Sequence, residues 1–142
     1  MAEVFSGFVI GYGLSLAFSW LAAVMLLEAR ARSPYLGRAI SANINVFMLS
    51  IPISILAFLF WTALGMIMGL LYRGAEANIP AGGLGSPNLV FTMSVAVSGL
   101  TILAVAWYAW QRFPPWRVTA FVVLSAALFG WAMPYMSRAA FD

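Results

Sequence analysis

Cysteine, histidine and lysine are all absent from this chain of 142 residues, and only 8% of its residues are charged. Without Cys or His, the chain cannot form a disulfide, a thiolate or imidazole metal site, or a Cys- or His-based nucleophile or base. We therefore predict no metal site, no catalytic residue and no redox cofactor held by this chain alone. A bound lipid or quinone stays compatible with the composition.

Apolar residues take the place of the missing charge. They make up 64% of the chain, and the mean hydropathy is +0.98. These values exclude a disordered chain or an ordinary soluble one, and they predict an all-α integral membrane protein with a single transmembrane domain over residues 1–142. The net charge of +3 does not indicate a nucleic-acid partner, because most arginines flank apolar runs.

Long uncharged runs predict four transmembrane helices. The first, Val4–Leu27, would span about 36 Å as a helix, against a hydrocarbon core of about 30 Å. Inside lipid the backbone must satisfy its own hydrogen bonds, so each run should be helical. The short connector 111–117 should make the last two spans antiparallel neighbours. The prediction is an antiparallel four-helix transmembrane bundle with spans at about 4–27, 42–72, 87–110 and 116–136.

Small residues recur every fourth position along the first run. Hydrophobicity does not join helices inside a bilayer, whereas close backbone approach does, and small side chains permit it. We therefore interpret these positions as a packing face, called here the small-residue stripe: Gly7, Gly11, Ser15, Ser19 and Ala23. Two further small pairs at the same spacing are predicted to pack helices: Gly65 with Gly69, and Ala126 with Gly130.

Arginine placement predicts the orientation. Five of the seven arginines lie in the turns 28–39 and 111–117, and two lie on the opposite side. The positive-inside rule places these turns in the cytoplasm and both termini outside, in what we expect to be a bacterial or archaeal cytoplasmic membrane. Glu28 and Arg32 are four apart and should pair. Ser33-Pro34 and Ser86-Pro87 each predict a helix start, and residues 73–86 predict a loop.

Two polar clusters are candidates for a site. One would bind an anionic headgroup, phosphate or carboxylate at the cytoplasmic edge: Arg30, Arg32, Tyr35, Arg38, Asn43 and Asn45. A topology-setting turn with helix caps explains the same residues and is favoured. The other consists of the hydroxyls of Ser50, Ser54 and Thr62 around Pro52. We interpret it as a kink whose freed backbone groups are satisfied by hydroxyls, in preference to a pore lining.

The four-span layout with Arg38, Ala39 and Asn43 in a basic turn resembles the MAPEG family of membrane glutathione-using enzymes. The chain departs from the family's pattern, because the Arg-to-Asn spacing is one residue longer and no acidic residue follows Asn43 shortly. The family is therefore not assigned.

No ionisable residue falls within the predicted hydrocarbon region, which disfavours a proton-coupled pump. We predict a non-catalytic structural or accessory subunit of a larger membrane complex, with membrane lipids and other membrane subunits as partners. A small homo-oligomeric channel or carrier is an alternative. A lipid- or quinone-binding membrane enzyme with a basic site at the cytoplasmic edge is a further alternative.

Overall fold

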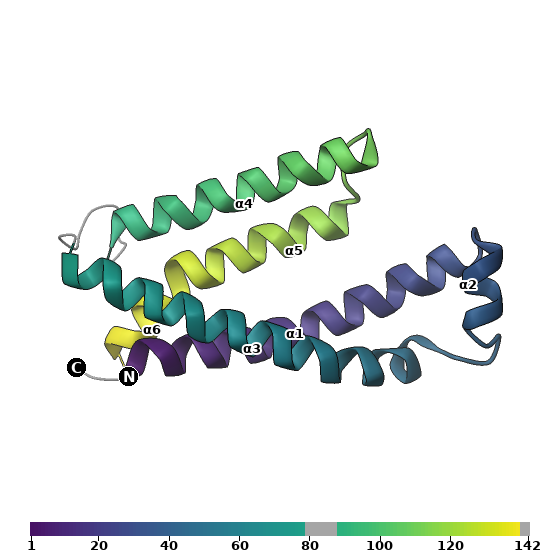
Figure 1. The fold of residues 1–142 in the computed structure, drawn as a ribbon, viewed down its shortest axis with the longest axis horizontal. Helices are drawn as coiled ribbons and strands as arrows, with labels where there is room; N and C mark the ends of the chain where they lie inside the picture. Colours follow the sequence, from purple (N-terminus) through teal and green to yellow (C-terminus); the bar gives the residue numbers. More distant parts are fainter. Residues whose placement is uncertain (79–87, 140–142) are drawn as a thin grey trace.

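The computed structural model describes residues 1–78 and 88–139, and every regular element in those ranges is helical. The elements are α1 (Ala2–Arg30), α2 (Pro34–Ala39), α3 (Val46–Asn78), α4 (Leu89–Trp110), α5 (Trp116–Ala127), the π-helical segment η1 (Leu128–Ala132) and α6 (Met133–Ala139). The last three follow one another without a break and form one helical span. Figure 1 shows the start of α1 and all of α6 at one end of the molecule and α2 at the other.

Four of the helical spans are long and apolar enough to cross a membrane: α1, α3, α4 and Trp116–Ala139. They contain 29, 33, 22 and 24 residues. At a rise of 1.5 Å per residue, even the shortest would extend about 33 Å, which exceeds a hydrocarbon core of about 30 Å. The prediction of an all-helical chain with four such spans is confirmed.

The most extensive helix contact in the described chain joins α1 to α3. A Cβ atom added to Gly7 would lie 2.0 Å from the carbonyl oxygen of Gly65, and one added to Gly65 would lie 2.0 Å from the carbonyl oxygen of Gly7. A Cβ on Gly11 would lie 2.2 Å from the carbonyl oxygen of Trp61. Contact positions rise along α1 as they fall along α3, so these two helices run in opposite directions (Figure 1).

The whole small-residue stripe of α1 is buried. Its two glycines meet the α3 backbone directly. Its two serines donate their hydroxyls within α1, Ser15 to the carbonyl of Tyr12 and Ser19 to the carbonyl of Ser15, each at 2.6 Å. No side chain longer than serine therefore separates α1 from its neighbours along this face.

The structure differs from the predicted second span at both ends. α3 begins at Val46 because Asn45 caps it, with the Asn45 Oδ1 accepting a hydrogen bond from the Met48 N–H at 2.8 Å. At the other end, residues 73–78 are helical although they were predicted as loop. Alanine and glutamate in this stretch favour helix, and the one glycine does not end it.

The predicted helix starts have two outcomes. Ser33 is the N-cap of α2 and Pro34 its first residue, as predicted. Ser86-Pro87 and residues 79–86 of the predicted loop lie outside the described residues. α4 begins at Leu89, where the Asn88 Oδ1 accepts a hydrogen bond from the Phe91 N–H at 3.0 Å.

α4 packs against α5 and η1. A Cβ atom added to Gly99 would lie 3.3 Å from the Ala126 Cβ, and one added to Gly130 would lie 3.3 Å from the Val95 Cβ. The two helices therefore run in opposite directions, which agrees with the short 111–117 connector. The π-helical segment η1, which ends two residues before Pro134, was not predicted.

The buried core lies toward the end of the molecule where α1 begins and α6 lies. Helix α4 contributes little to it, because most of its residues after position 99 are exposed. The core draws on all four spans, through Ile10, Leu14, Tyr72, Phe91, Phe129 and Met133. The α1–α3 hairpin and the hairpin of α4 with the fourth span thus pack closely near one end of the molecule and less closely toward the other.

The α1–α3 contact predicts a large difference between two glycines of α1. Gly11→Ala should lower the free energy of unfolding by about 1 to 3 kcal/mol, because its Cβ would overlap the Trp61 carbonyl. Gly13→Ala is the matched control, since a Cβ there meets nothing within 4 Å. It should be neutral or stabilising by up to about 1 kcal/mol. Unfolding in mixed micelles measures both, and equal stability of the two variants would contradict the contact.

Candidate functional site

Acidic and basic side chains lie only at the two ends of the described helices. Inward from these ends, the central turns of α1, α3, α4 and α5 carry no Asp, Glu or Arg. One end, called here the basic end, has five arginines and one glutamate, a side-chain charge of +4: Arg30, Arg32, Arg38, Arg112, Arg117 and Glu28. The other, called here the terminal end, has two arginines and two glutamates among the described residues, so their side-chain charges sum to zero: Arg73, Arg138, Glu3 and Glu76.

The predicted headgroup residues all lie at the basic end, between the close of α1 and the start of α3. Five of the six are exposed and Arg30 is half-buried. Asn45 has a structural role as the α3 cap, and the Asn43 N–H lies 3.5 Å from the Ser41 hydroxyl. No hydrogen bond or ion pair links the six to one another within residues 1–78, so they form an open basic surface and not a closed pocket.

An ion pair crosses between the hairpins at the basic end. Arg117, in the first turn of α5, pairs with Glu28 near the end of α1. The predicted pairing of Glu28 with Arg32 is wrong, because α1 ends at Arg30 and the helical register that would align the two is lost. The other four arginines at this end make no ion pair with any described residue.

The terminal end is internally neutralised. The buried Tyr72 donates its hydroxyl to the Glu76 carboxylate, and the Arg138 Nε lies 3.6 Å from the same carboxylate. These residues come from α3 and α6, so the cluster fastens the end of the second span to the end of the fourth. The charges of Glu76 and Arg138 cancel, so this cluster attracts a charged ligand only weakly.

An apolar cleft of about 370 Å³ lies between α3 and the α4–α5 hairpin. Its walls come from α3, α4, α5 and η1, and the residues that line it are Trp61, Leu64, Met68, Val95, Ser98, Gly99, Ile102, Phe121, Val122, Ser125, Ala126 and Phe129. Both serines donate their hydroxyls to carbonyls of their own helices at 2.8 Å. The cleft surface is thus hydrocarbon in character and suits an apolar ligand.

Trp61 is the largest side chain at the cleft wall. Its ring makes an edge-to-face contact with Phe121, with centroids 5.3 Å apart, and a tilted contact with Phe18 at 5.7 Å. Its Nε1 is buried and has no hydrogen-bond partner among the described residues. The two rings, from α1 and α5, therefore hold the indole in place.

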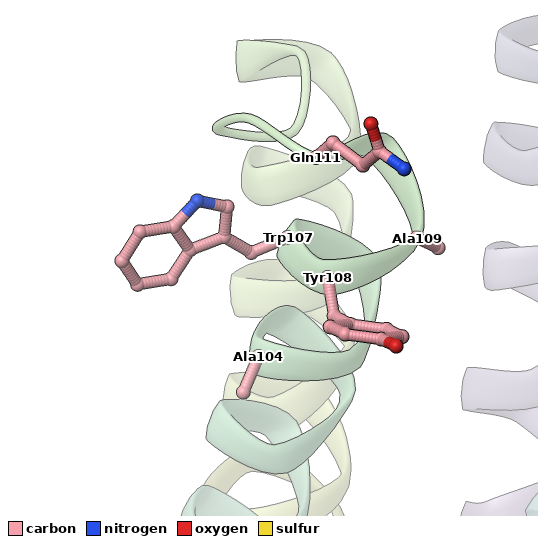
Figure 2. A pocket seen from close by; sticks show the side chains of 5 residues that line it. All are labelled: Ala104, Trp107, Tyr108, Ala109 and Gln111. Atoms are coloured by element: carbon pink, nitrogen blue, oxygen red, sulfur yellow. The ribbon is translucent and has the colours of Figure 1, made fainter.

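A second depression, of about 550 Å³, lies on the outer surface at the end of α4. All its lining residues belong to that one helix end, and Figure 2 shows Trp107 and Tyr108 projecting to different sides of it. Gln111 closes the helix in the left-handed region, at φ 53°. With no opposing wall, this surface is typical of the aromatic belt at a membrane interface.

Hydroxyl groups along the spans donate within their own helices. Ser94, Ser98 and Thr101 on α4 bond to carbonyls four residues earlier, at 2.8, 2.8 and 2.9 Å. Thr62 does the same on α3, at 2.6 Å. The hydroxyls beside Pro52 donate to the Phe47 and Ile51 carbonyls, and not to the Met48 carbonyl that the proline leaves without its helical donor. The expected repair by these two hydroxyls is therefore wrong.

One hydroxyl does repair a proline site, and it was missed from the sequence. Pro134 has no N–H to offer the Gly130 carbonyl, four residues earlier. The Thr92 Oγ1 on α4 lies 2.7 Å from that carbonyl oxygen and donates to it. The proline spacing could have identified the Gly130 carbonyl, but only the packing of α4 identifies the donor.

Metal ligation has no support in the described ranges, where no three acidic side chains gather. Three features of the described residues are candidates for a function: packing faces of small residues, a basic surface with aromatic side chains, and an apolar cleft between the hairpins.

The Thr92 contact predicts a specific loss of stability. Thr92→Val keeps the side-chain shape but removes the donor to Gly130, and it should lower the free energy of unfolding by about 0.6 to 2 kcal/mol. Thr101→Val is the matched control on the same helix, because that hydroxyl is exposed and bonds only within α4. Unfolding in mixed micelles distinguishes the two, and equal losses would contradict an interhelical role for Thr92.

No protein-family model, curated protein or solved structure matches this chain. The comparisons therefore add no homologue from which an activity or a site could be transferred. The residues and their geometry are the basis for the function proposed next.

Proposed function

We propose that this chain is an integral membrane protein whose four spans form an antiparallel bundle, with both termini outside and the basic end in the cytoplasm. The apolar side chains that are exposed along α3 and α4 support insertion, since soluble proteins rarely expose so continuous an apolar surface to water. Among the described residues, the side-chain charge of +4 at one end and zero at the other supports the orientation.

Within that membrane, the chain is a non-catalytic subunit of a larger assembly. The observation that carries this proposal is the state of the mid-span polar groups. No acidic or basic side chain lies in the central turns of the described helices, and the exposed hydroxyls of α4 donate to their own backbone. A transport path needs polar groups that are free to replace the hydration of a solute.

The exposed face of α4 supports a partner on that side. Ser94, Ser98 and Thr101 lie on one face of this helix and are all exposed in the single chain. Small hydroxyl residues at a helix surface permit close approach of another helix, as the α1–α3 pair shows for glycines. A neighbouring subunit packed on α4 would use this face.

The same row of hydroxyls favours a second candidate, a small homo-oligomeric channel. Several copies arranged around an axis would bring their α4 faces together, with Ser94, Ser98 and Thr101 toward the centre. This candidate requires the hydroxyls to exchange their helical acceptors for a solute. It ranks below the subunit role because no ionisable group assists them at mid-depth.

Orientation is tested with a reporter that is active only in the cytoplasm. Fused after Asp142, it should be inactive, because the positive-inside rule keeps the basic end in the cytoplasm and both termini outside. The same reporter inserted after Gly37 should be active and serves as the control. A reporter that is active after Asp142 and inactive after Gly37 would show that the orientation is the opposite of the one proposed.

The subunit role is tested by native purification in mild detergent followed by mass analysis of the co-purifying chains. Unlike membrane chains should accompany this one in a fixed ratio, and the chain alone in liposomes should pass neither ions nor small solutes above the empty-vesicle leak. A homo-oligomer with saturable flux, abolished by Ser94→Ala with Ser98→Ala, would replace the subunit role with the channel. Gly13→Ala, which touches no neighbour, is the control variant for flux.

A further inference from the structure

We propose that the cleft between α3 and the α4–α5 hairpin holds one acyl chain of an anionic phospholipid, whose headgroup lies on the arginines of the basic end. The proposal rests on the membrane insertion proposed above, but it does not depend on the subunit role. It joins two features that the packing of helices leaves unexplained, an unfilled apolar space and an excess of unpaired arginines.

The cleft has the character of an acyl-chain site. Its volume of about 370 Å³ falls within the usual range for small-molecule sites, and its lining is nearly all hydrocarbon. Along α4 the lining runs from Val95 to Ile102, and along the fourth span from Phe121 to Phe129. These stretches correspond to a depth of about 10 to 12 Å at the helical rise. Hydrocarbon fills such a space without leaving a polar group unpaired.

The polar groups at the cleft make a quinone headgroup a poorer occupant. Ser98 and Ser125 already donate to their own helices, and the Trp61 Nε1 is covered by neighbouring atoms. A quinone carbonyl placed at this depth would therefore find no accessible donor. An acyl chain requires none.

The basic end is within reach of the cleft. Phe121, at the cleft wall, follows Arg117 by one helical turn on α5, a separation of about 6 Å along the axis. Arg117 also crosses to Glu28 on α1, so a charged group stands where the two hairpins separate. A lipid whose chain enters beside Phe121 would bring its phosphate to this level.

The unpaired arginines select an anionic headgroup. Arg30, Arg32, Arg38 and Arg112 have no carboxylate partner among the described residues. At the terminal end, the charges of the described acidic and basic side chains sum to zero. Exposed aromatic side chains stand beside them, including Tyr35, Phe113 and Trp116. Basic side chains near aromatic rings at the interface attract anionic lipid.

The test is a lipid titration of the purified full chain in mild detergent, followed by native mass spectrometry. The probes are dioleoyl phosphatidylglycerol and dioleoyl phosphatidylcholine. Wild type should bind one phosphatidylglycerol molecule at least about fivefold more tightly than phosphatidylcholine. Arg112→Gln should lose about fivefold in phosphatidylglycerol affinity, whereas Arg73→Gln, at the terminal end, should leave it unchanged.

The cleft is tested by a matched pair of serines. Ser98→Leu fills part of the cleft and should abolish the single tight binding event, whereas Ser94→Leu, one turn away and outside the cleft lining, should not. Ile102→Phe is a second cleft variant in case Ser98→Leu fails to fold, which thermal unfolding of each variant reveals. Equal binding by the cleft variants and wild type would overturn the proposal.

Three further outcomes would overturn it: equal affinity for the two lipids, equal loss in Arg112→Gln and Arg73→Gln, or a co-purified quinone displaced by the cleft variants. Failure of the proposed membrane insertion is recognised separately. In that case alkaline carbonate would release the wild-type chain from membranes, before any lipid is added.

Discussion

The approach of two backbones, α1 against α3, is the contact on which the rest of the structure depends. Gly7 and Gly65 face each other so closely that neither position can hold a Cβ atom without a shift of the backbone. In lipid, apolar side chains gain nothing by leaving one hydrocarbon neighbour for another, so association depends on packing at short range. Once α1 and α3 are fixed in this way, their core residues Leu14 and Tyr72 are held where α4 and α6 can pack on them.

The second hairpin is attached less evenly. Near the terminal end, core packing and the Tyr72–Glu76–Arg138 cluster hold it to the first hairpin, while at the basic end the link is the ion pair of Arg117 with Glu28. That pair is partly exposed, so solvent and headgroup charges weaken it and it contributes little to stability. The apolar cleft lies along this less tightly packed part of the interface, and a membrane would fill it with hydrocarbon.

Backbone hydrogen bonding explains a contact that composition does not suggest. Prolines inside spans leave carbonyls without donors, and an unpaired carbonyl is costly in a low-dielectric medium. At Pro134 the donor comes from another helix, through Thr92, so the defect in one span becomes a link between two. At Pro52 the neighbouring serines bond to other carbonyls, and the span remains helical through the proline.

Features that depend only on residues close together in the chain could be predicted from the sequence. Uncharged runs of the right length determine four helices, Ser33-Pro34 determines the start of α2, and four-residue spacing determines which face of α1 is small. Contacts between residues far apart in the chain could not be predicted from the sequence, because they depend on how the helices are rotated and offset against each other. The four-residue spacing predicted that Glu28 pairs with Arg32. Because α1 ends at Arg30, before that residue, Glu28 pairs instead with Arg117 of α5. Likewise, the Gly130 carbonyl could be identified from proline spacing, but its donor and the cleft between the hairpins exist only once α4 and α5 are packed, since tertiary packing alone sets their distance from α3.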